Sequence, residues 1–203
     1  MTKLLELKNI SKTFPGVKAL QNVNLDLEAG EVLGLCGENG AGKSTLMKIL
    51  TGIYTADPGG QIWLEGKQVT VGGVAHAREL GLSIIHQELN MVPDLTVAQN
   101  LYLGRPGSHK SGWINDSKLN HEAAKLFERL GMNLDPTARI GDLSVARQQM
   151  VEIARALSYN SRILVMDEPT AALTVGETEA LFGMIRDFVT ASTGLIYISH
   201  RMP

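Results

Sequence analysis

A glycine-rich segment at residues 37–45 constrains the fold of this chain more than any other part of the sequence. It is Gly-Glu-Asn-Gly-Ala-Gly-Lys-Ser-Thr, the pattern G-x-x-x-x-G-K-S of a phosphate-binding P-loop. Gly37, Gly40 and Gly42 can take positive φ angles and let the backbone come close to a ligand. Their N–H groups, with the N-terminus of a following helix, would form a cradle for an anion.

The side chains of this segment predict which atoms meet the nucleotide. Lys43 can reach the β- and γ-phosphates and so take part in catalysis, and the Ser44 hydroxyl can ligate Mg²⁺. Asn39 and Thr45 complete the nucleotide-binding residues that we predict here.

The flanking residues predict the strand and helix that such a loop needs. The apolar run 31–36 is expected to be a buried strand, and residues 45–52 a helix that ends at Gly52. We expect Cys36, in this strand, to be an inert core residue. One cysteine excludes an internal disulfide and suits a reducing compartment.

Charge and hydropathy argue against several kinds of partner. The chain has 203 residues and a net charge of −2, without the Lys/Arg runs that nucleic acid or an acidic membrane surface would attract. No apolar run approaches the roughly 20 residues of a membrane span. We therefore expect a cytoplasmic chain, which can still act at a membrane by docking on another subunit.

The order of the remaining patterns predicts an α/β fold with an inserted helical subdomain. Residues 1–89 and 161–203 would form the core, a mostly parallel sheet flanked by helices together with N-terminal antiparallel strands, and residues 90–160 the helical subdomain. The expected strands are 4–10, 20–27, 61–65, 82–86, 162–166 and 194–199, and the expected helices are 74–80, 116–130 and 175–190.

Two carboxylates, Asp167 and Glu168, directly follow the buried strand predicted at 162–166. Ligands bind at the carboxyl ends of parallel strands. In P-loop enzymes the first such carboxylate holds Mg²⁺, and the second would be placed to polarise a water as general base. A solvated helix N-cap is the alternative, since acidic residues also suit that position. The P-loop upstream favours the chemical role.

Three further residues are candidates for the same site. Gln87 follows the strand predicted at 82–86, and its amide could meet Mg²⁺ or the attacking water. His200 follows the last strand and is a candidate contact of the γ-phosphate. Phe14, beside Pro-Gly, could be a loop anchor or a platform on which a base stacks.

In this order the motifs resemble the nucleotide-binding domain of ABC ATPases, over nearly the whole chain. The resemblance assigns Walker A to 37–45, the Q-loop glutamine to Gln87, the signature segment to 143–147, Walker B to 163–167, the D-loop to 169–174 and the switch histidine to His200.

Within that family, the chain is similar to carbohydrate-importer ATPases that carry two such domains in one polypeptide. Five phrases carry this likeness: Lys-Thr-Phe-Pro-Gly-Val-Lys-Ala-Leu at 12–20, Gly-Glu-Asn-Gly-Ala-Gly-Lys-Ser-Thr-Leu-Met-Lys-Ile-Leu at 37–50, Ile-His-Gln-Glu-Leu at 85–89, Gln-Met-Val-Glu-Ile-Ala-Arg at 149–155 and Asp-Glu-Pro-Thr-Ala-Ala-Leu-Thr at 167–174.

This resemblance implies a mechanism and a set of partners. Two domains would face head to tail around two MgATP, the second domain coming from the same full-length chain or from a second copy. Ser144 of one domain would face the γ-phosphate bound by the other. Membrane-spanning permease subunits would receive the motion on the inner face of the cell membrane, with a solute-binding protein acting indirectly and no nucleic acid involved.

The sequence departs from the family pattern in two places. Val145, Ala146 and Arg147 stand where the signature usually reads Gly-Gly-Gln. Arg147 could grip phosphate or form a surface ion pair. The chain also ends three residues after His200, which predicts a C-terminally truncated domain with an exposed sheet edge.

Two other functions compete with an importer ATPase. A soluble ABC-type ATPase acting on ribosomes or nucleic acid would need clustered Lys and Arg for binding to the phosphate backbone, and the near-neutral charge disfavours it. An unrelated P-loop kinase would leave the signature segment and His200 without a role.

Overall fold

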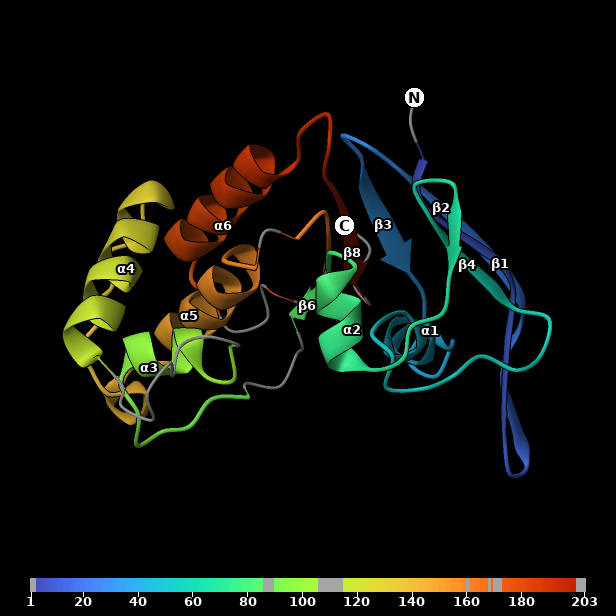
Figure 1. Cartoon of the computed structure of the whole chain (residues 1–203), viewed down its shortest axis with the longest axis horizontal. Helices are drawn as coiled ribbons and strands as arrows, with labels where there is room; N and C mark the ends of the chain where they lie inside the picture. Colours follow the sequence, from blue (N-terminus) through green and yellow to red (C-terminus); the bar gives the residue numbers. More distant parts are fainter. Residues whose placement is uncertain are drawn as a thin grey trace.

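The computed structural model describes residues 3–85, 90–105, 115–159, 161–167, 169 and 173–199. Within these ranges the strands form two four-stranded sheets, one antiparallel and one parallel, with helices between and beside them (Figure 1). This α/β architecture, with N-terminal antiparallel strands and a helical insertion, confirms the fold class predicted from the sequence.

The antiparallel sheet contains β1 (Lys3–Phe14), β2 (Val17–Glu28), β4 (Gln61–Leu64) and β5 (Lys67–Val69), in the order β2-β1-β4-β5. The sequence did not predict β5, whose three residues are too few to show an alternating pattern.

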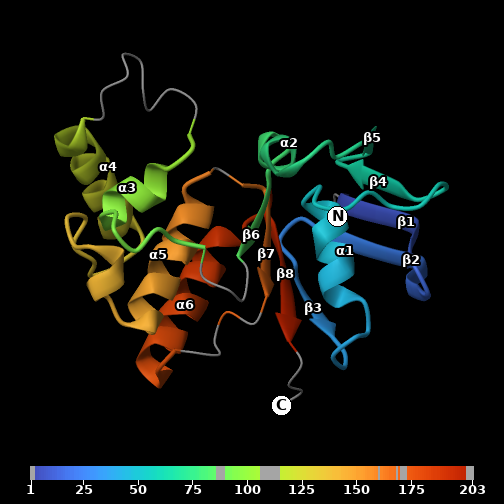
Figure 2. The same cartoon turned by 90° about the horizontal axis from the view of Figure 1, so that it is seen from below.

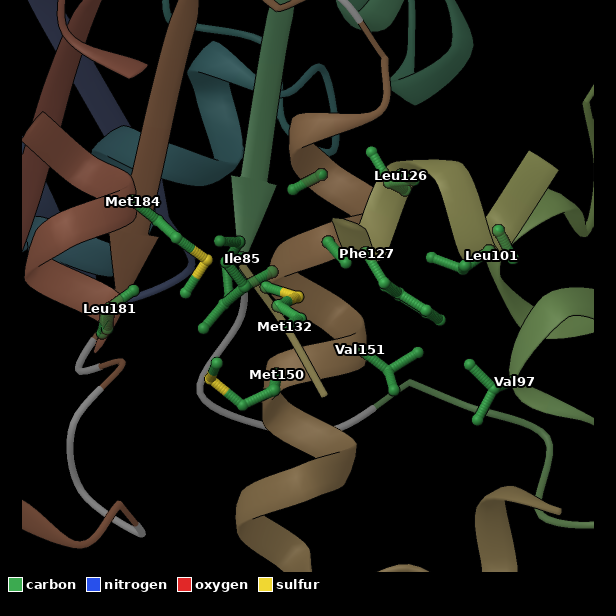
Figure 3. Packing of buried hydrophobic residues seen from close by; sticks show 14 of the residues in the cluster. Ile85, Val97, Leu101, Leu126, Phe127, Met132, Met150, Val151, Leu181 and Met184 are labelled. Carbon is green, nitrogen blue, oxygen red and sulfur yellow. The ribbon is translucent and has the colours of Figure 1, made fainter. Parts of the chain in front are cut away.

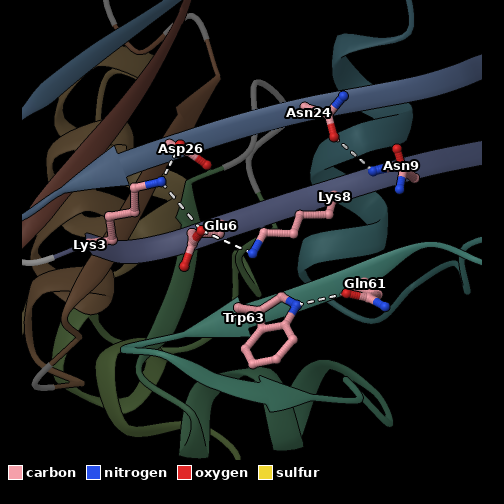
Figure 4. Close-up of polar contacts among 8 residues, drawn as sticks. All are labelled: Lys3, Glu6, Lys8, Asn9, Asn24, Asp26, Gln61 and Trp63. Carbon is pink, nitrogen blue, oxygen red and sulfur yellow. Dashed lines mark hydrogen bonds and ion pairs between the residues drawn. The ribbon is translucent and has the colours of Figure 1, made fainter.

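One face of this sheet is charged (Figure 4). Lys3 Nζ lies 2.7 Å from a carboxylate oxygen of Asp26, and Lys8 Nζ lies 3.2 Å from one of Glu6. The opposite face buries leucines of β1 and β2 against the core.

The parallel sheet contains β3 (Val32–Cys36), β6 (Leu82–Ile85), β7 (Ile163–Asp167) and β8 (Gly194–Ser199), in the order β3-β8-β7-β6. Strand β7 lies between β8 and β6, and its residues 163–166 are buried, as the sequence predicts. Alternate residues of β7 pack into two hydrophobic clusters, one on each face of the sheet.

A strand is present where one was predicted at 31–36, but the prediction that it is buried is wrong. Strand β3 pairs with β8 at the end of the described sheet, and Val32 is 51% exposed. Cys36 is also exposed and is not a core residue. An apolar run is buried only where neighbours cover it, and an edge strand has fewer of them.

Different helices cover the two faces of the parallel sheet (Figure 2). Helix α1 (Lys43–Leu50) lies between the two sheets and buries Leu46, Met47, Ile49 and Leu50 there. Helices α5 (Val145–Leu157) and α6 (Val175–Phe188) cover the opposite face. Helix α2 (Val74–Glu79) precedes β6.

Residues 90–159 are mainly helical where the structure describes them. They contain α3 (Val97–Tyr102), α4 (Asp116–Arg129), the 3₁₀ turn η1 (Ile140–Asp142) and α5. Val97, Leu101 and Phe127 belong with Val151 of α5 to one buried cluster, which Figure 3 shows. Helix α3 was not predicted from the sequence, although Thr96 and Gln99 form a capping box at its start. Within the described ranges, no helix combines the length and apolarity that crossing a bilayer requires.

Candidate functional site

The loop that joins β3 to α1 has the backbone of an anion cradle. Gly40 and Gly42 take φ angles of +86° and +91°, whereas Gly37 is not among the residues with positive φ. A Cβ at Gly42 would lie 2.6 Å from the carbonyl oxygen of Ala19 and 2.7 Å from Leu20 Cδ2. Position 42 therefore needs glycine for its conformation and also for its packing against β2.

Gly42 is also the N-cap of α1, and none of the side chains that the structure describes caps this helix. The first turn contains no acidic residue either. The first N–H groups of a helix need acceptors, and the helix dipole favours negative charge at this end. The start of α1 is therefore suited to an anion supplied from outside the chain.

The Lys43 side chain folds over the same loop. Its Nζ donates to the carbonyl oxygens of Gly37 at 2.5 Å and Glu38 at 3.0 Å. Ser44 and Asn39 are exposed, and Thr45 is half-buried. One short stretch of the chain, residues 37–45, thus carries the Lys43 ammonium, the Ser44 hydroxyl and the N-terminus of α1.

The register of the parallel sheet places Asp167 at the edge from which this loop leaves. Cys36 pairs with Ser199, and Asp167 pairs with Ile198 one step earlier on the same strand. Only β8 separates β3 from β7, so the two strands lie roughly 10 Å apart. Asp167 is half-buried at the end of β7.

A hydroxyl and a carboxylate, Ser44 and Asp167, are hard oxygen donors that suit Mg²⁺, which keeps several ligands from water and phosphate. In the part of the chain that the structure describes, no three His, Cys, Asp or Glu side chains converge as a metal-binding group. Ser44 and Asp167 have the donor chemistry for a magnesium ion that is held jointly with a bound phosphate.

Three predicted site residues, Gln87, Glu168 and His200, lie outside the described residues. The strands that precede them end at Ile85, Asp167 and Ser199, and all three strands run parallel in one sheet. Their roles remain predictions.

Phe14, at the end of β1, packs between the hairpin of β1 and β2 and the segment that follows α1. Its ring lies edge-on to Tyr54, with 5.2 Å between the centroids, and Lys12 Nζ lies 5.6 Å from its centroid. Lys12 also donates to the carbonyl oxygen of Thr55 at 2.7 Å. These contacts support the loop-anchor interpretation, and stacking of a base on Phe14 remains a prediction.

Ser144 is the N-cap of α5, and its hydroxyl accepts a hydrogen bond from the backbone N–H of Arg147 at 3.4 Å. Val145 is 57% exposed, and Arg147 is exposed. Hydrogen bonds from Thr174 lower the pKa of the Glu177 carboxyl, and the positive charge of Arg147 lowers it further. Arg147 therefore interacts electrostatically with the start of α6, in keeping with a surface role.

Helix α5 also contacts the segment that follows β7. The Gln149 amide nitrogen donates to the carbonyl oxygen of Pro169 at 2.5 Å, and both residues are buried. The sequence reading missed this contact. The indication of it in the sequence is that Gln149, a polar residue, lies on the face of the helix that carries the apolar residues.

A pocket of about 190 Å³ lies between α2, β6 and α5. Glu152 lines it and is 8% exposed, with Oε2 at 3.8 Å from a guanidinium nitrogen of Arg155. Burial raises the pKa of the Glu152 carboxyl, and the positive charges of Arg155 and Arg78 oppose this shift. The sequence reading assigned this residue no role.

Comparison with known proteins gives the family. The profile described as "ABC transporter" matches residues 20–171, which is more than half of the chain. The chain therefore belongs to the ABC transporter family.

The curated relatives have more specific names. The chain is 54% identical, over 203 residues, to a putative ribose/galactose/methyl galactoside import ATP-binding protein of Albidiferax ferrireducens, covering 100% of this chain and 40% of the relative. A protein of the same name from Geobacillus kaustophilus is 50% identical over 200 residues, or 98% of this chain and 40% of the relative. The chain thus spans about two fifths of the length of these relatives.

Solved structures agree on the fold. The ADP conformation of an ATP-binding cassette of an ABC transporter is 29% identical, with a TM-score of 0.84 over 100% of this chain and 83% of that one. A nucleotide-free ATP-binding cassette from an ABC transporter has the same identity and TM-score, over 98% of this chain and 82% of that one.

Proposed function

We propose that this chain is an ATP-binding and ATP-hydrolysing domain that energises import of a sugar or sugar-like solute through a membrane ABC transporter. The observation that carries the proposal is the loop at 37–45. Its positive-φ glycines, the uncapped start of α1 and the Lys43 ammonium converge on one anion-binding surface. The names of the relatives supply the solute class.

Each predicted residue has a distinct task in this proposal. Lys43 and the N–H groups of residues 40–45 bind the β- and γ-phosphates. Ser44 and Asp167 would hold Mg²⁺, with Gln87 as a further ligand, and the ion would supply positive charge beside the phosphates. Glu168 accepts a proton from the attacking water, and His200 contacts the γ-phosphate.

A second nucleotide-binding domain would complete the site. Ser144 and the start of α5 would face the γ-phosphate held by that domain, which is again an anion at a helix N-terminus. The second domain would belong to the same full-length polypeptide or to another copy. Asn39, Thr45 and Phe14 complete the nucleotide contacts on this chain.

The partners follow from the transport role. Membrane-spanning permease subunits would bind the full-length protein at the inner face of the cell membrane, and an external solute-binding protein would act through them. Closure of the domains around ATP and their opening after hydrolysis would drive the permease.

Transport in a reconstituted system tests the proposal. The full-length protein with its permease and solute-binding protein in proteoliposomes should take up labelled ribose or galactose only when ATP is supplied on the side of this domain, and a Glu168→Gln variant should take up none. Hydrolysis by the full-length protein with no membrane partner recovered in a pull-down would contradict the importer role.

A further inference from the structure

Gln149 is a buried amide with a single described acceptor that is distant in sequence. It is 7% exposed, and its Nε2 donates at 2.5 Å to the carbonyl oxygen of Pro169, which is itself buried. A buried amide is costly unless it is hydrogen-bonded, so this contact is a defined feature of the packing between α5 and the segment after β7.

The contact lies beside the predicted catalytic residues in the chain. Pro169 follows Asp167 and Glu168 directly. On the amino-terminal side, Asp167 is held in the sheet by its pairing with Ile198. On the carboxyl-terminal side, the hydrogen bond from Gln149 fixes the Pro169 carbonyl. The backbone is thus held on both sides of the predicted base.

The same helix begins at the predicted signature residue. Ser144 caps α5, and Gln149 follows five residues later, roughly 7.5 Å along the helix axis. Gln148 donates to the carbonyl oxygen of Leu143 at 3.0 Å and so ties the residue before Ser144 to the helix. One rigid element therefore carries the signature end and the contact with Pro169.

We infer that Gln149 is a positioning residue for hydrolysis, which holds the backbone after Asp167, at Pro169, in register with the signature end of α5. This inference rests on the proposed function. It adds a physical connection between the signature residue Ser144 and the catalytic segment of the same chain. Gln149 does not reach the P-loop in this account, so it acts on the chemical step and not on nucleotide binding.

Two variants separate this role from a general loss of stability. Gln149→Met keeps the length and helix propensity of the side chain but removes the donor. Ser161→Ala is the matched control, because Ser161 Oγ donates to Ser83 Oγ at 2.5 Å in an equally buried place just before the amino end of β7, far from Asp167 along the strand. For both, kcat and KM for MgATP, the affinity for a non-hydrolysable ATP analogue and Tm are measured.

We expect Gln149→Met to lower kcat about tenfold or more, because small misplacements of catalytic groups cost this much. Its KM and its affinity for the analogue should stay close to the wild-type values. Ser161→Ala should lower Tm to a similar extent with kcat near that of the wild type. A wild-type kcat in Gln149→Met, or equal kcat losses in the two variants, would overturn the positioning role.

Hydrogen exchange gives a readout that does not depend on turnover. Amides of residues 168–175 should exchange faster in Gln149→Met and not in Ser161→Ala, while the amides of α1 stay as in the wild type. Unchanged exchange at 168–175 would also overturn the inference. If the wild type neither binds nor hydrolyses MgATP, it is the proposed function that fails.

Discussion

Lys43 Nζ lies 2.5 Å from the carbonyl oxygen of Gly37, the residue at which its own loop begins. The side chain thus bridges the loop, with a second hydrogen bond to Glu38. A phosphate bound in the loop would offer the ammonium charged oxygen acceptors, which form stronger hydrogen bonds than neutral carbonyls.

Replacement of Lys43 should therefore remove tight binding of MgATP. Hydrogen bonds to charged groups contribute roughly 1.5–3 kcal/mol each, so loss of two in Lys43→Ala should raise Kd by about a hundredfold or more. Titration calorimetry measures this. Lys48→Ala, at the other end of α1 and beside Tyr54, is the control and should bind normally. Equal affinity in the wild type and Lys43→Ala would exclude the loop as the phosphate site.

The two positive-φ glycines of the loop should differ in their tolerance of a methyl group. Gly40→Ala adds a Cβ in open space, so its cost is the left-handed conformation alone, about 1–2 kcal/mol. Gly42→Ala adds the same strain and also brings Cβ within 2.6 Å of the Ala19 carbonyl oxygen.

Gly42→Ala should therefore lower Tm more than Gly40→Ala and also displace the start of α1, weakening MgATP binding. Thermal unfolding with and without MgATP measures both effects. Equal losses in the two variants would show that the packing between Gly42 and β2 does not constrain the loop.

Glu152 should make the protein less stable as the pH rises. Burial raises the pKa of this carboxyl in the folded state above its ordinary value of 4.5, so the folded protein holds the proton more tightly than the unfolded chain. Stability is then lost as the pH rises from about 4.5 through the raised pKa. Glu152→Gln should be more stable than the wild type at pH 7, and the difference should disappear at acidic pH.

Glu177 provides a control of opposite sign. Hydrogen bonds from Thr174 lower the pKa of its carboxyl, so it contributes stability that is present above 4.5 and is lost as the pH falls. Urea unfolding of Glu177→Gln and Glu152→Gln across this pH range should therefore give differences from the wild type in opposite directions. A Glu152→Gln variant that is less stable at pH 7 would show that the pairing with Arg155 outweighs burial.

Local features of the chain could be predicted from the sequence, whereas the burial of its strands could not in every case. The spacing of Gly37, Gly42 and Lys43 identifies the loop, because the motif depends on local backbone chemistry. The capping box of Thr174 and Glu177 is likewise local, and it is present at the start of α6. Burial of β3 could not be predicted, since Val32 is exposed only because of the position of β3 in the sheet.

Contacts between distant segments were also beyond the sequence. The hydrogen bond from Gln149 to Pro169 joins residues 20 apart, and nothing in the periodicity of α5 indicates its acceptor. Glu152 and Arg155 are neighbours on α5, but the other walls of the pocket that they line come from α2 and β6. That burial is set by tertiary packing, which single-sequence patterns do not specify.

In the proposed function, two nucleotide-binding domains of this type hydrolyse MgATP with Glu168 as base. The most direct measurement is the rate of hydrolysis per mole of chain against chain concentration, for the wild type and for Glu168→Gln. We predict that the wild-type specific rate rises with concentration, as a composite site requires, and that Glu168→Gln binds nucleotide without turning it over. Wild-type turnover in Glu168→Gln would contradict the account, and a specific rate that does not depend on concentration would exclude a site formed by two copies of this domain.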